Sequence, residues 1–287
     1  MPEPLIIKTV ADMSRWSKDQ FKAGRTIGFV PTMGALHAGH RGLIERARRE
    51  NDAVAVSIFV NPTQFGPHED FHKYPRTFDA DRKLCAEAGA DCIFFPDVKE
   101  MYDQDARTWV EVGGLGDTLC GLSRPSHFRG VTTVVAKLFN IVRPDRAYFG
   151  QKDAQQLRIL EVLTRDLCFG IEIVPCETVR EPDGLALSSR NQYLSPDERQ
   201  QALCLLRALE YCKKRVAAGE RDAMKLSGEM AGMIEKEPDA EIDYVALVDA
   251  ETLDDLHTLS GEVLVALAVK IGNTRLIDNV RISLPKP

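Results

Sequence analysis

The sequence lacks several features that would assign it to a special class of protein. No apolar run approaches the ~20 residues that a membrane-spanning helix needs, and the opening Met1-Pro2-Glu3-Pro4 lacks the basic-then-apolar pattern of a signal peptide. An excess of positive charge is also missing, because 37 basic side chains stand against 43 acidic ones. We therefore expect a cytoplasmic protein with no membrane partner and no nucleic-acid partner, although this balance still allows a local basic pocket for a small polyanion.

Recognisable metal and phosphate motifs are missing too. The seven cysteines are odd in number and include no Cys-x-x-Cys pair, so we expect most of them to be small buried hydrophobic residues. The glycine cluster at 113–116 is not followed by Lys-Ser or Lys-Thr, which excludes a Walker-type loop. The acidic segment 97–105 is expected to be a solvated loop, with a metal site as the less favoured alternative.

The order of apolar runs predicts an α/β fold in a chain of 287 residues, long enough for two domains. Helix-like segments separate short strand-like runs, and the run at 53–60 is rich in β-branched residues, as in a strand covered on both faces. We expect a Rossmann-like parallel sheet in an N-terminal domain, residues 1–184, and a smaller α+β C-terminal domain, residues 185–287. The expected strands are 5–10, 26–30, 53–60, 92–96, 145–149 and 171–175 in the first domain, and 242–248 and 263–269, followed by a tail at 274–279, in the second.

Two histidines stand where the strand 26–30 gives way to a helix. A helix N-terminus offers unpaired backbone N–H groups and the positive end of the helix dipole, which favour an anion such as phosphate. His37 and His40 are three residues apart and should share one face of the first helical turn, where both rings can donate to phosphate. Gly34 and Gly39 leave room for close approach. The alternative is two unrelated histidines in a surface turn.

Two further strand ends carry polar residues, and ligands of open α/β sheets bind at this edge. Gln64 follows the strand 53–60 in an Asn-Pro-Thr-Gln turn and offers an amide with both donors and an acceptor. Asn61, in the same turn, is equally well explained as an ordinary turn residue. Lys152 follows the strand 145–149 beside a helix start, where its ammonium can meet phosphate as a mobile point charge.

Two loops add candidate anion ligands. Residues 188–190 place two hydroxyls and a guanidinium in one loop, which could close over a triphosphate. Arg124 and Arg129 precede an amphipathic helix at 131–142 and could bind anionic substrate groups, although loop arginines are usually only solvated.

These motifs together carry a family resemblance. His37-Ala38-Gly39-His40 after a first strand resembles the signature of the nucleotidylyltransferase and class I aminoacyl-tRNA synthetase superfamily. With its prefix, residues 31–36, it closely resembles the pantoate–β-alanine ligase family, and segments 61–65, 150–156, 187–191 and 272–279 match that family in the same order. The chain departs from the family pattern at Gln151, where glutamate is usual, at Ala154, where an aromatic is common, and at Ser126, where the family has glycine.

The resemblance implies an activity and a set of site residues. The implied reaction is the ATP-dependent condensation of pantoate with β-alanine through a pantoyl adenylate, with release of AMP and pyrophosphate, by a homodimer that uses Mg²⁺ with ATP. The C-terminal domain would act as a lid. Catalytic roles fall on His40, His37 and Lys152, and Gln64 and Gln156 would bind pantoate, Gln64 also β-alanine. The implied ATP contacts are Pro31, Thr32, Met33, Gly34, His37, Gly39, His40, Gly150, Lys152, Asp153, Val179, Leu187, Ser188, Ser189 and Arg190; the protein ligands of the metal are unknown.

Three other classes compete with this interpretation. A nucleotidylyltransferase would leave AMP attached to its product. A protein resembling an aminoacyl-tRNA synthetase would need a tRNA surface, which the acidic balance disfavours. A non-enzymatic nucleotide-binding module would have little use for the second-substrate residues Gln64 and Gln156.

Overall fold

The structure, a computed structural model, describes residues 3–67 and 69–285. It divides into two compact units. The first comprises the chain up to Gly116 with Arg124–Gln151 and Gln156–Glu177, and the second comprises Asp117–Ser123, Lys152–Gln155 and the chain from Thr178 onward. The domain ranges expected from the sequence, 1–184 and 185–287, stay a prediction. Within the described ranges, no helix combines the length and the apolar character needed to cross a membrane.

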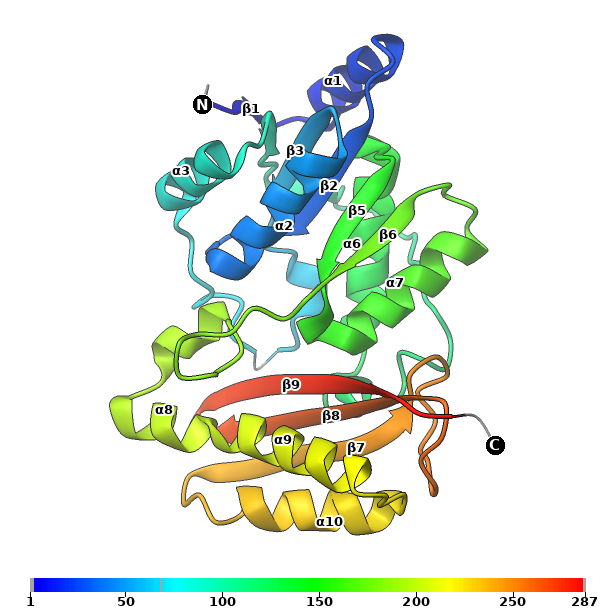
Figure 1. Ribbon diagram of the computed structural model, residues 1–287. Helices are drawn as coiled ribbons and strands as arrows, with labels where there is room; N and C mark the ends of the chain where they lie inside the picture. The colour runs from blue at the N-terminus through cyan, green and yellow to red at the C-terminus, as the bar shows by residue number, and fades with distance from the viewer. Residues whose placement is uncertain (1–2, 68, 286–287) are drawn as a thin grey trace. The chain divides into compact units, whose positions relative to one another are not determined.

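The first unit is built on a six-stranded parallel sheet (Figure 1). The strand order is β1-β4-β3-β2-β5-β6, so the chain builds outward from β2 on one side and from β5 on the other. This reversal places a topological switch point between β2 and β5, where α/β proteins bind ligands at the carboxyl ends of the strands. The Rossmann-like parallel sheet is therefore confirmed. The strands are β1 Leu5–Ile7, β2 Ile27–Thr32, β3 Ala53–Ile58, β4 Cys92–Phe94, β5 Arg146–Gly150 and β6 Glu172–Cys176.

Helices cover both faces of this sheet, because successive strand side chains point to opposite faces. On one face Phe29 and Phe149 pack with side chains from α1, α6 and α7. On the other Val30 and Tyr148 pack with side chains from α2 and α3; Figure 1 shows α2 in front of the sheet. Every residue of β3 is buried, as expected for a strand covered twice. The helices are α1 Val10–Lys22, α2 Ala38–Glu50, α3 Phe78–Ala88, α6 His127–Val142 and α7 Ala154–Asp166.

Three local expectations for this unit were wrong. The acidic segment 97–105 contains a one-turn helix, α4 Val98–Met101, because Asp97 caps its N-terminus through the N–H of Glu100. The helix expected from residue 131 begins at His127. Thr77 before an acidic first turn is a pattern that predicts the N-cap of α3, but Thr77 makes no capping bond; its hydroxyl donates to Asp81 instead.

The second unit contains a three-stranded antiparallel sheet, in the order β7-β8-β9, with helices on one face. Residues 274–279, expected to form a tail, belong instead to the third strand, which pairs along its whole length with β8. Ser195, followed by Pro196 and two acidic residues, is a pattern that predicts a capped helix start, and the structure confirms it, since Ser195 and Glu198 form a reciprocal capping box. The elements are α5 Cys120–Ser123, α8 Pro196–Ala202, α9 Cys204–Ala217, α10 Ala223–Ile234, β7 Ala240–Asp249, β8 Glu262–Ile271 and β9 Thr274–Ser283.

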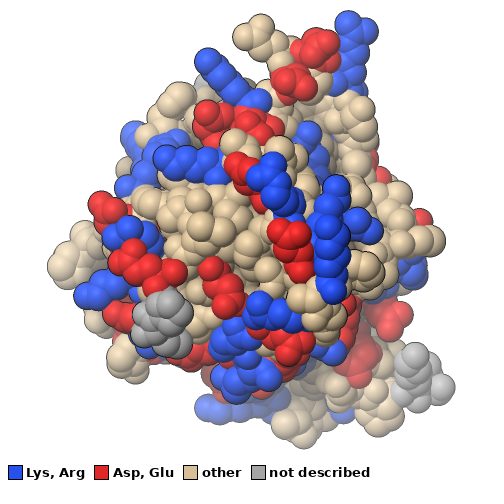
Figure 2. Space-filling model, turned by 90° about the horizontal axis from the view of Figure 1, so that it is seen from above, with Lys and Arg blue, Asp and Glu red and all other residues tan. Residues whose placement is uncertain are grey.

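Surface charge and cysteines follow the composition. Basic and acidic side chains are interspersed over the face shown in Figure 2. Six of the seven cysteines are buried and Cys168 is exposed, which confirms that most of them are small buried residues.

Candidate active site

A side chain from a different helix holds the loop between β2 and α2. Asp81, in the first turn of α3, is only 2% exposed. Its carboxylate accepts from the N–H groups of Ala35 and Leu36, at 3.0 and 2.8 Å. The loop needs this anchor because Gly34 and Ala35 both have positive φ, 85° and 51°, which is costly for Ala35. Asp81 thus fixes the backbone that leads into His37.

The two histidines cap the helix that follows. His37 is the N-cap of α2, and its Nδ1 accepts from the N–H of Gly39 at 3.2 Å. His40 returns the bond, because its Nδ1 accepts from the N–H of His37 at 3.3 Å. The two ring centroids lie 4.1 Å apart. A side chain at Gly39 would collide with the His37 ring, since a Cβ there would lie 2.9 Å from Cε1.

This capping fixes the chemistry of both rings. A neutral imidazole has one donor and one acceptor nitrogen, so a ring whose Nδ1 accepts carries its proton on Nε2. His37 and His40 therefore each present an Nε2–H donor. The expectation that the amides at this helix start are unpaired needs one correction, because the N–H of Gly39 is already bonded to His37.

The turn after β3 is organised by Asn61. This residue is 1% exposed and caps the short helix η1 Pro62–Gln64. Its Nδ2 donates to Gln64 Oε1 and to the carbonyl of Gly130, both at 3.1 Å. Gln64 Nε2 in turn lies 3.1 Å from Met33 Sδ, which brings two of the expected site residues together.

Arg124 and His127 contact the backbone and the neighbouring residues of the same turn. The Nδ1 atom of His127 lies 2.7 Å from the Gln64 carbonyl oxygen, and Arg124 Nε donates to Glu69 Oε1 at 2.8 Å. Burial alone would raise the pKa of Glu69, but the hydrogen bond and charge of Arg124 outweigh it and lower that pKa. Arg124, expected as a candidate anion ligand, is thus engaged by a carboxylate of its own chain. The Arg129 guanidinium stacks 5.0 Å over the Trp109 ring.

The strand β5 ends at Gly150, directly before the turn that contains Lys152. Lys152 lies in the short helix η2 Gln151–Asp153, with 19% of its side chain exposed and its Nζ 3.9 Å from Asp153 Oδ1. Its carbonyl accepts from Asn279 Nδ2 of β9 at 2.8 Å. Gln156 follows in the first turn of α7.

The loop with two hydroxyls and a guanidinium has a defined shape in the second unit. Ser188 caps the short helix η3 Ser189–Tyr193, and its Oγ accepts from the N–H of Arg190 at 3.3 Å. The N–H of Leu187 donates to the carbonyl of Val179 at 2.9 Å, which joins two further expected ATP contacts.

A partly buried ion pair supports the entry to this loop. Arg180 donates to both carboxylate oxygens of Asp278, at 2.6 and 3.0 Å, and Asp278 is 3% exposed. The same guanidinium donates to the Gly184 carbonyl at 3.1 Å. Lys152, Asp153 and residues 187–190 belong to this second unit, whereas the histidines and both glutamines belong to the first.

The sequence did not predict the roles of the residues that hold the loops of the candidate site. Four of them bond to site residues or their loops: Asp81, Tyr102, Asp278 and Asn279. Asp278 and Asn279 lie in the segment 272–279 that matches the family, but the motif gave neither a role, and nothing in the sequence distinguishes Asp81 or Tyr102 from other polar residues of their segments. Asp79 and Asp81, for example, both stand in the first turn of α3, and only burial shows which carboxylate points inward.

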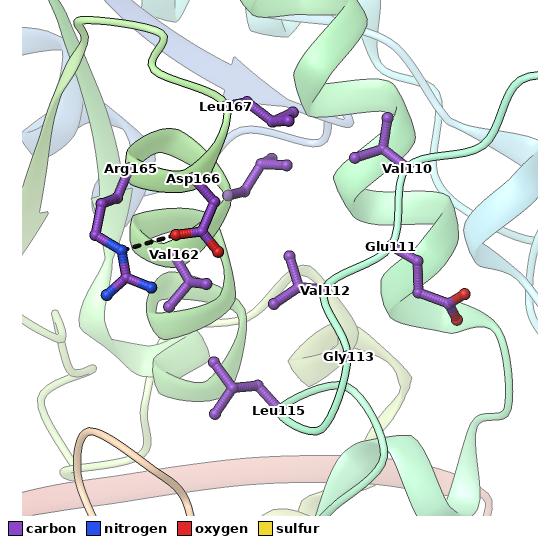
Figure 3. Close-up of a pocket in the computed structure, with 10 residues that line it drawn as sticks. Val110, Glu111, Val112, Gly113, Leu115, Val162, Arg165, Asp166 and Leu167 are labelled. Carbon is purple, nitrogen blue, oxygen red and sulfur yellow. Dashed lines mark hydrogen bonds and ion pairs between the residues drawn. The ribbon is translucent and has the colours of Figure 1, made fainter.

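A separate cavity lies elsewhere in the first unit (Figure 3). It has a volume of about 400 Å³ and separates the segment 110–115 from the C-terminal half of α7. Six of its ten lining residues are Val or Leu, and Arg165 pairs with Asp166 at one side. None of the expected site residues lines it. Within the described ranges no three histidine, cysteine or acidic side chains gather closely enough to hold a metal ion.

Known proteins resemble this chain over nearly its whole length. The family model described as pantoate–β-alanine ligase matches residues 5–281. The pantothenate synthetase of Thermotoga petrophila is 56% identical over 274 residues, 96% of this chain and 98% of the relative. The crystal structure of pantothenate synthetase from Thermus thermophilus superposes with a TM-score of 0.91 at 45% identity, over 96% of this chain and 98% of that one.

A more distant structure preserves the same fold. The pantoate–β-alanine ligase of Francisella tularensis, solved in complex with β-γ ATP and β-alanine, has a TM-score of 0.78 at 33% identity, and the match covers 96% of this chain and 97% of that one. A family match over nearly the whole chain, with relatives above half identity, decides the assignment. The chain belongs to the pantoate–β-alanine ligase family and is a ligase.

Proposed function

We propose that the protein condenses (R)-pantoate with β-alanine in two steps driven by ATP. A carboxylate is a poor electrophile, so it must first be activated. A pantoate carboxylate oxygen attacks the α-phosphorus of ATP, the bond to the β-phosphate oxygen breaks, and pyrophosphate leaves. The amine of β-alanine then attacks the acyl carbon of the pantoyl adenylate, the acyl C–O bond breaks, AMP leaves with the electron pair, and the amine loses a proton.

The two histidines that cap α2 are the observation that supports this proposal best. Because both Nδ1 atoms accept from backbone N–H groups, both Nε2–H groups are donors of fixed direction at the start of α2. Fixed donors stabilise charge that grows on phosphoryl oxygens without reorganising during the reaction. We assign His37 and His40 to the phosphates of ATP as hydrogen-bond donors, and His40 to the charge that develops during adenylation.

The remaining expected contacts complete the proposed site. Lys152, with Ser188, Ser189 and Arg190, would neutralise the triphosphate, and Mg²⁺ would arrive with ATP as part of the substrate, carried by its phosphates. Gln64 and Gln156 would hold pantoate, and Gln64 also β-alanine. The other proposed ATP contacts are Pro31, Thr32, Met33, Gly34, Gly39, Gly150, Asp153, Val179 and Leu187.

We also propose that the second unit contributes a closing lid that shields the adenylate from water. Lys152 and the 187–190 loop both belong to that unit. A homodimer, implied by the family resemblance, and a cytoplasmic location, expected from the sequence, stay predictions.

The test is AMP formation from ATP and pantoate, with and without β-alanine. The proposal expects ATP–pyrophosphate exchange that depends on pantoate, and multiple-turnover AMP release only when β-alanine is added. His40→Ala and Lys152→Ala should each lower the adenylation rate by about 10²–10³-fold, the usual effect of removing one donor to a developing oxyanion. A stable adenylylated product that β-alanine does not cleave would identify a nucleotidylyltransferase, and an unchanged exchange rate in both variants would remove these residues from the mechanism.

A further inference from the structure

Tyr102 lies immediately behind the turn that carries Gln64. It follows α4, and its hydroxyl donates to Asn61 Oδ1 at 2.9 Å and lies 3.4 Å from Thr63 Oγ1. Its ring lies near the Phe59 ring, with centroids 6.3 Å apart, and the Lys137 ammonium stands over it at 5.2 Å. Burial raises the pKa of this phenol, so it stays a neutral donor. The ring thus has an aromatic and a cationic neighbour, and its hydroxyl donates to the amide of Asn61.

The surroundings of Asn61 allow its amide only one orientation. Its Oδ1 faces the Thr63 N–H and the Thr63 hydroxyl, at 3.4 and 3.0 Å, as well as Tyr102. Its Nδ2 faces the Gly130 carbonyl, which can only accept. A flipped amide would set N–H against N–H on one side and oxygen against oxygen on the other. Because Asn61 is 1% exposed, water cannot repair such a mismatch.

The orientation passes on to Gln64. Since Asn61 Nδ2 is a donor, the Gln64 atom 3.1 Å from it must be the acceptor Oε1, which leaves the Gln64 NH₂ group on the other side. There it meets Met33 Sδ at 3.1 Å, a weak acceptor that a stronger one can replace. The backbone of Gln64 is also held, because its carbonyl oxygen lies 2.7 Å from His127 Nδ1. The residue therefore presents N–H donors, which suit a hydroxyl or carboxylate oxygen.

We propose that Tyr102 is a positioning residue for substrate binding: through Asn61 it fixes the Gln64 amide with its NH₂ group directed at an oxygen of pantoate. The proposal rests on the proposed role of Gln64 in holding pantoate. It gives a function to a tyrosine whose hydroxyl contacts Asn61 and Thr63 rather than Gln64 itself.

The close packing behind the turn explains why one hydroxyl can matter. A Cβ at Gly130 would lie 2.3 Å from the Thr63 carbonyl oxygen, so α6 and the turn touch backbone to backbone. A turn held this tightly cannot shift to restore a lost bond. Removing the Tyr102 hydroxyl therefore leaves Asn61 Oδ1 with fewer donors and weakens the hold on Gln64.

The test compares Tyr102→Phe with Tyr148→Phe as a matched control. Tyr148 is fully buried, and its hydroxyl bonds Asn51 and Glu50, away from the candidate site residues. Tyr102→Phe should raise the KM for pantoate roughly five- to tenfold, the effect of one hydrogen bond, with kcat and the KM for ATP changed less than twofold. Tyr148→Phe should leave all three constants unchanged, and urea unfolding of both variants reports any loss of stability separately.

A thermodynamic cycle with Gln64→Ala separates this proposal from the proposed function. If Tyr102 acts through Gln64, Tyr102→Phe should raise the pantoate KM in the wild-type background and leave it unchanged in the Gln64→Ala background. An equal rise in both backgrounds, or no rise in either while Gln64→Ala raises it, overturns the role of Tyr102 alone. A Gln64→Ala variant with an unchanged pantoate KM overturns the role of Gln64 itself.

Discussion

Asp81 offers a direct test of how the histidine loop is held. The carboxylate is 2% exposed and accepts from the Ala35 and Leu36 N–H groups and from the Thr77 hydroxyl. Asp81→Asn keeps the shape of the side chain but replaces one acceptor oxygen by an NH₂ group. With the amide oxygen at Oδ1, the bonds from Leu36 and Thr77 survive and the NH₂ group opposes the N–H of Ala35.

The expected loss of stability in Asp81→Asn follows from the hydrogen bond that the Ala35 N–H loses. A hydrogen bond to a charged group contributes about 1.5–3 kcal/mol, and an unsatisfied buried donor costs about 1–3 kcal/mol. The two figures describe overlapping losses, so we expect Asp81→Asn to lower the free energy of unfolding by about 2–4 kcal/mol. Ala35, held at φ 51°, should then relax and displace His37. A displacement of about 1 Å in a catalytic group can cost ~10²-fold in rate, and we expect a loss of adenylation activity of about 10–100-fold.

Asp79→Asn is the matched control. Asp79 stands in the same first turn of α3, so both substitutions remove one negative charge from the same helix end, but Asp79 is exposed. The control should change the unfolding free energy by less than about 0.5 kcal/mol and leave activity intact. Urea unfolding and pantoate-dependent ATP–pyrophosphate exchange measure the two effects. If Asp81→Asn unfolds at the same urea concentration as Asp79→Asn and exchanges at the same rate, Asp81 does not hold the loop.

Three further predictions concern other parts of the chain. A thiol reagent should modify Cys168 rapidly and the six buried cysteines only after denaturation, and a second fast thiol in the native protein would contradict the burial. Because the pKa of Glu69 is lowered in the folded state, its pair with Arg124 should stabilise the protein fully above the unfolded carboxyl pKa and progressively less as the pH falls. The stability advantage of the wild type over Glu69→Gln should therefore shrink between about pH 6 and pH 3, and a constant difference would refute the pairing. Asp278→Asn should cost near the lower end of the ~3–5 kcal/mol typical of a broken buried pair, because the Arg180 side chain is 28% exposed, and a double replacement Arg180→Met with Asp278→Leu should cost less than the two single changes together.

The strands of the parallel sheet were predictable because their signal is local. Continuous apolar runs such as that of β3 report burial on both faces directly. The missed third strand of the small sheet has a different cause. In β9 the inward positions include Asp278, whose charge is paired with Arg180, so the buried face of this strand does not read as an apolar pattern. Because Asp278 stands at an inward position, the alternation of apolar and polar residues that would predict this strand is interrupted.

The histidine motif was recognisable because its signal is also local, but the hydrogen bonds of its two rings could not be predicted. The spacing of His37 and His40 correctly placed both rings at one helix start, and the ring contact agrees with this. The sequence could not show that each ring accepts from a backbone N–H, because this depends on the extended backbone of His37 at the N-cap. The difference matters chemically, since it decides which nitrogen of each ring is the donor.

The supporting residues whose roles were not predicted share one property: they act across long sequence separations. Asp81 bonds Ala35 from 46 positions away, Tyr102 bonds Asn61 from 41, and Asn279 bonds the Lys152 carbonyl from 127. A motif records residues that stand beside a ligand in one continuous segment, whereas these supports become neighbours only when the chain folds. Each of them holds backbone or one amide and carries no proposed chemistry. Substitutions at these three positions should therefore act through the placement of substrates and donors, so that Asp81→Asn slows adenylation only by displacing His37. Substitutions of His40 and Lys152 should change the rate of the chemical step directly.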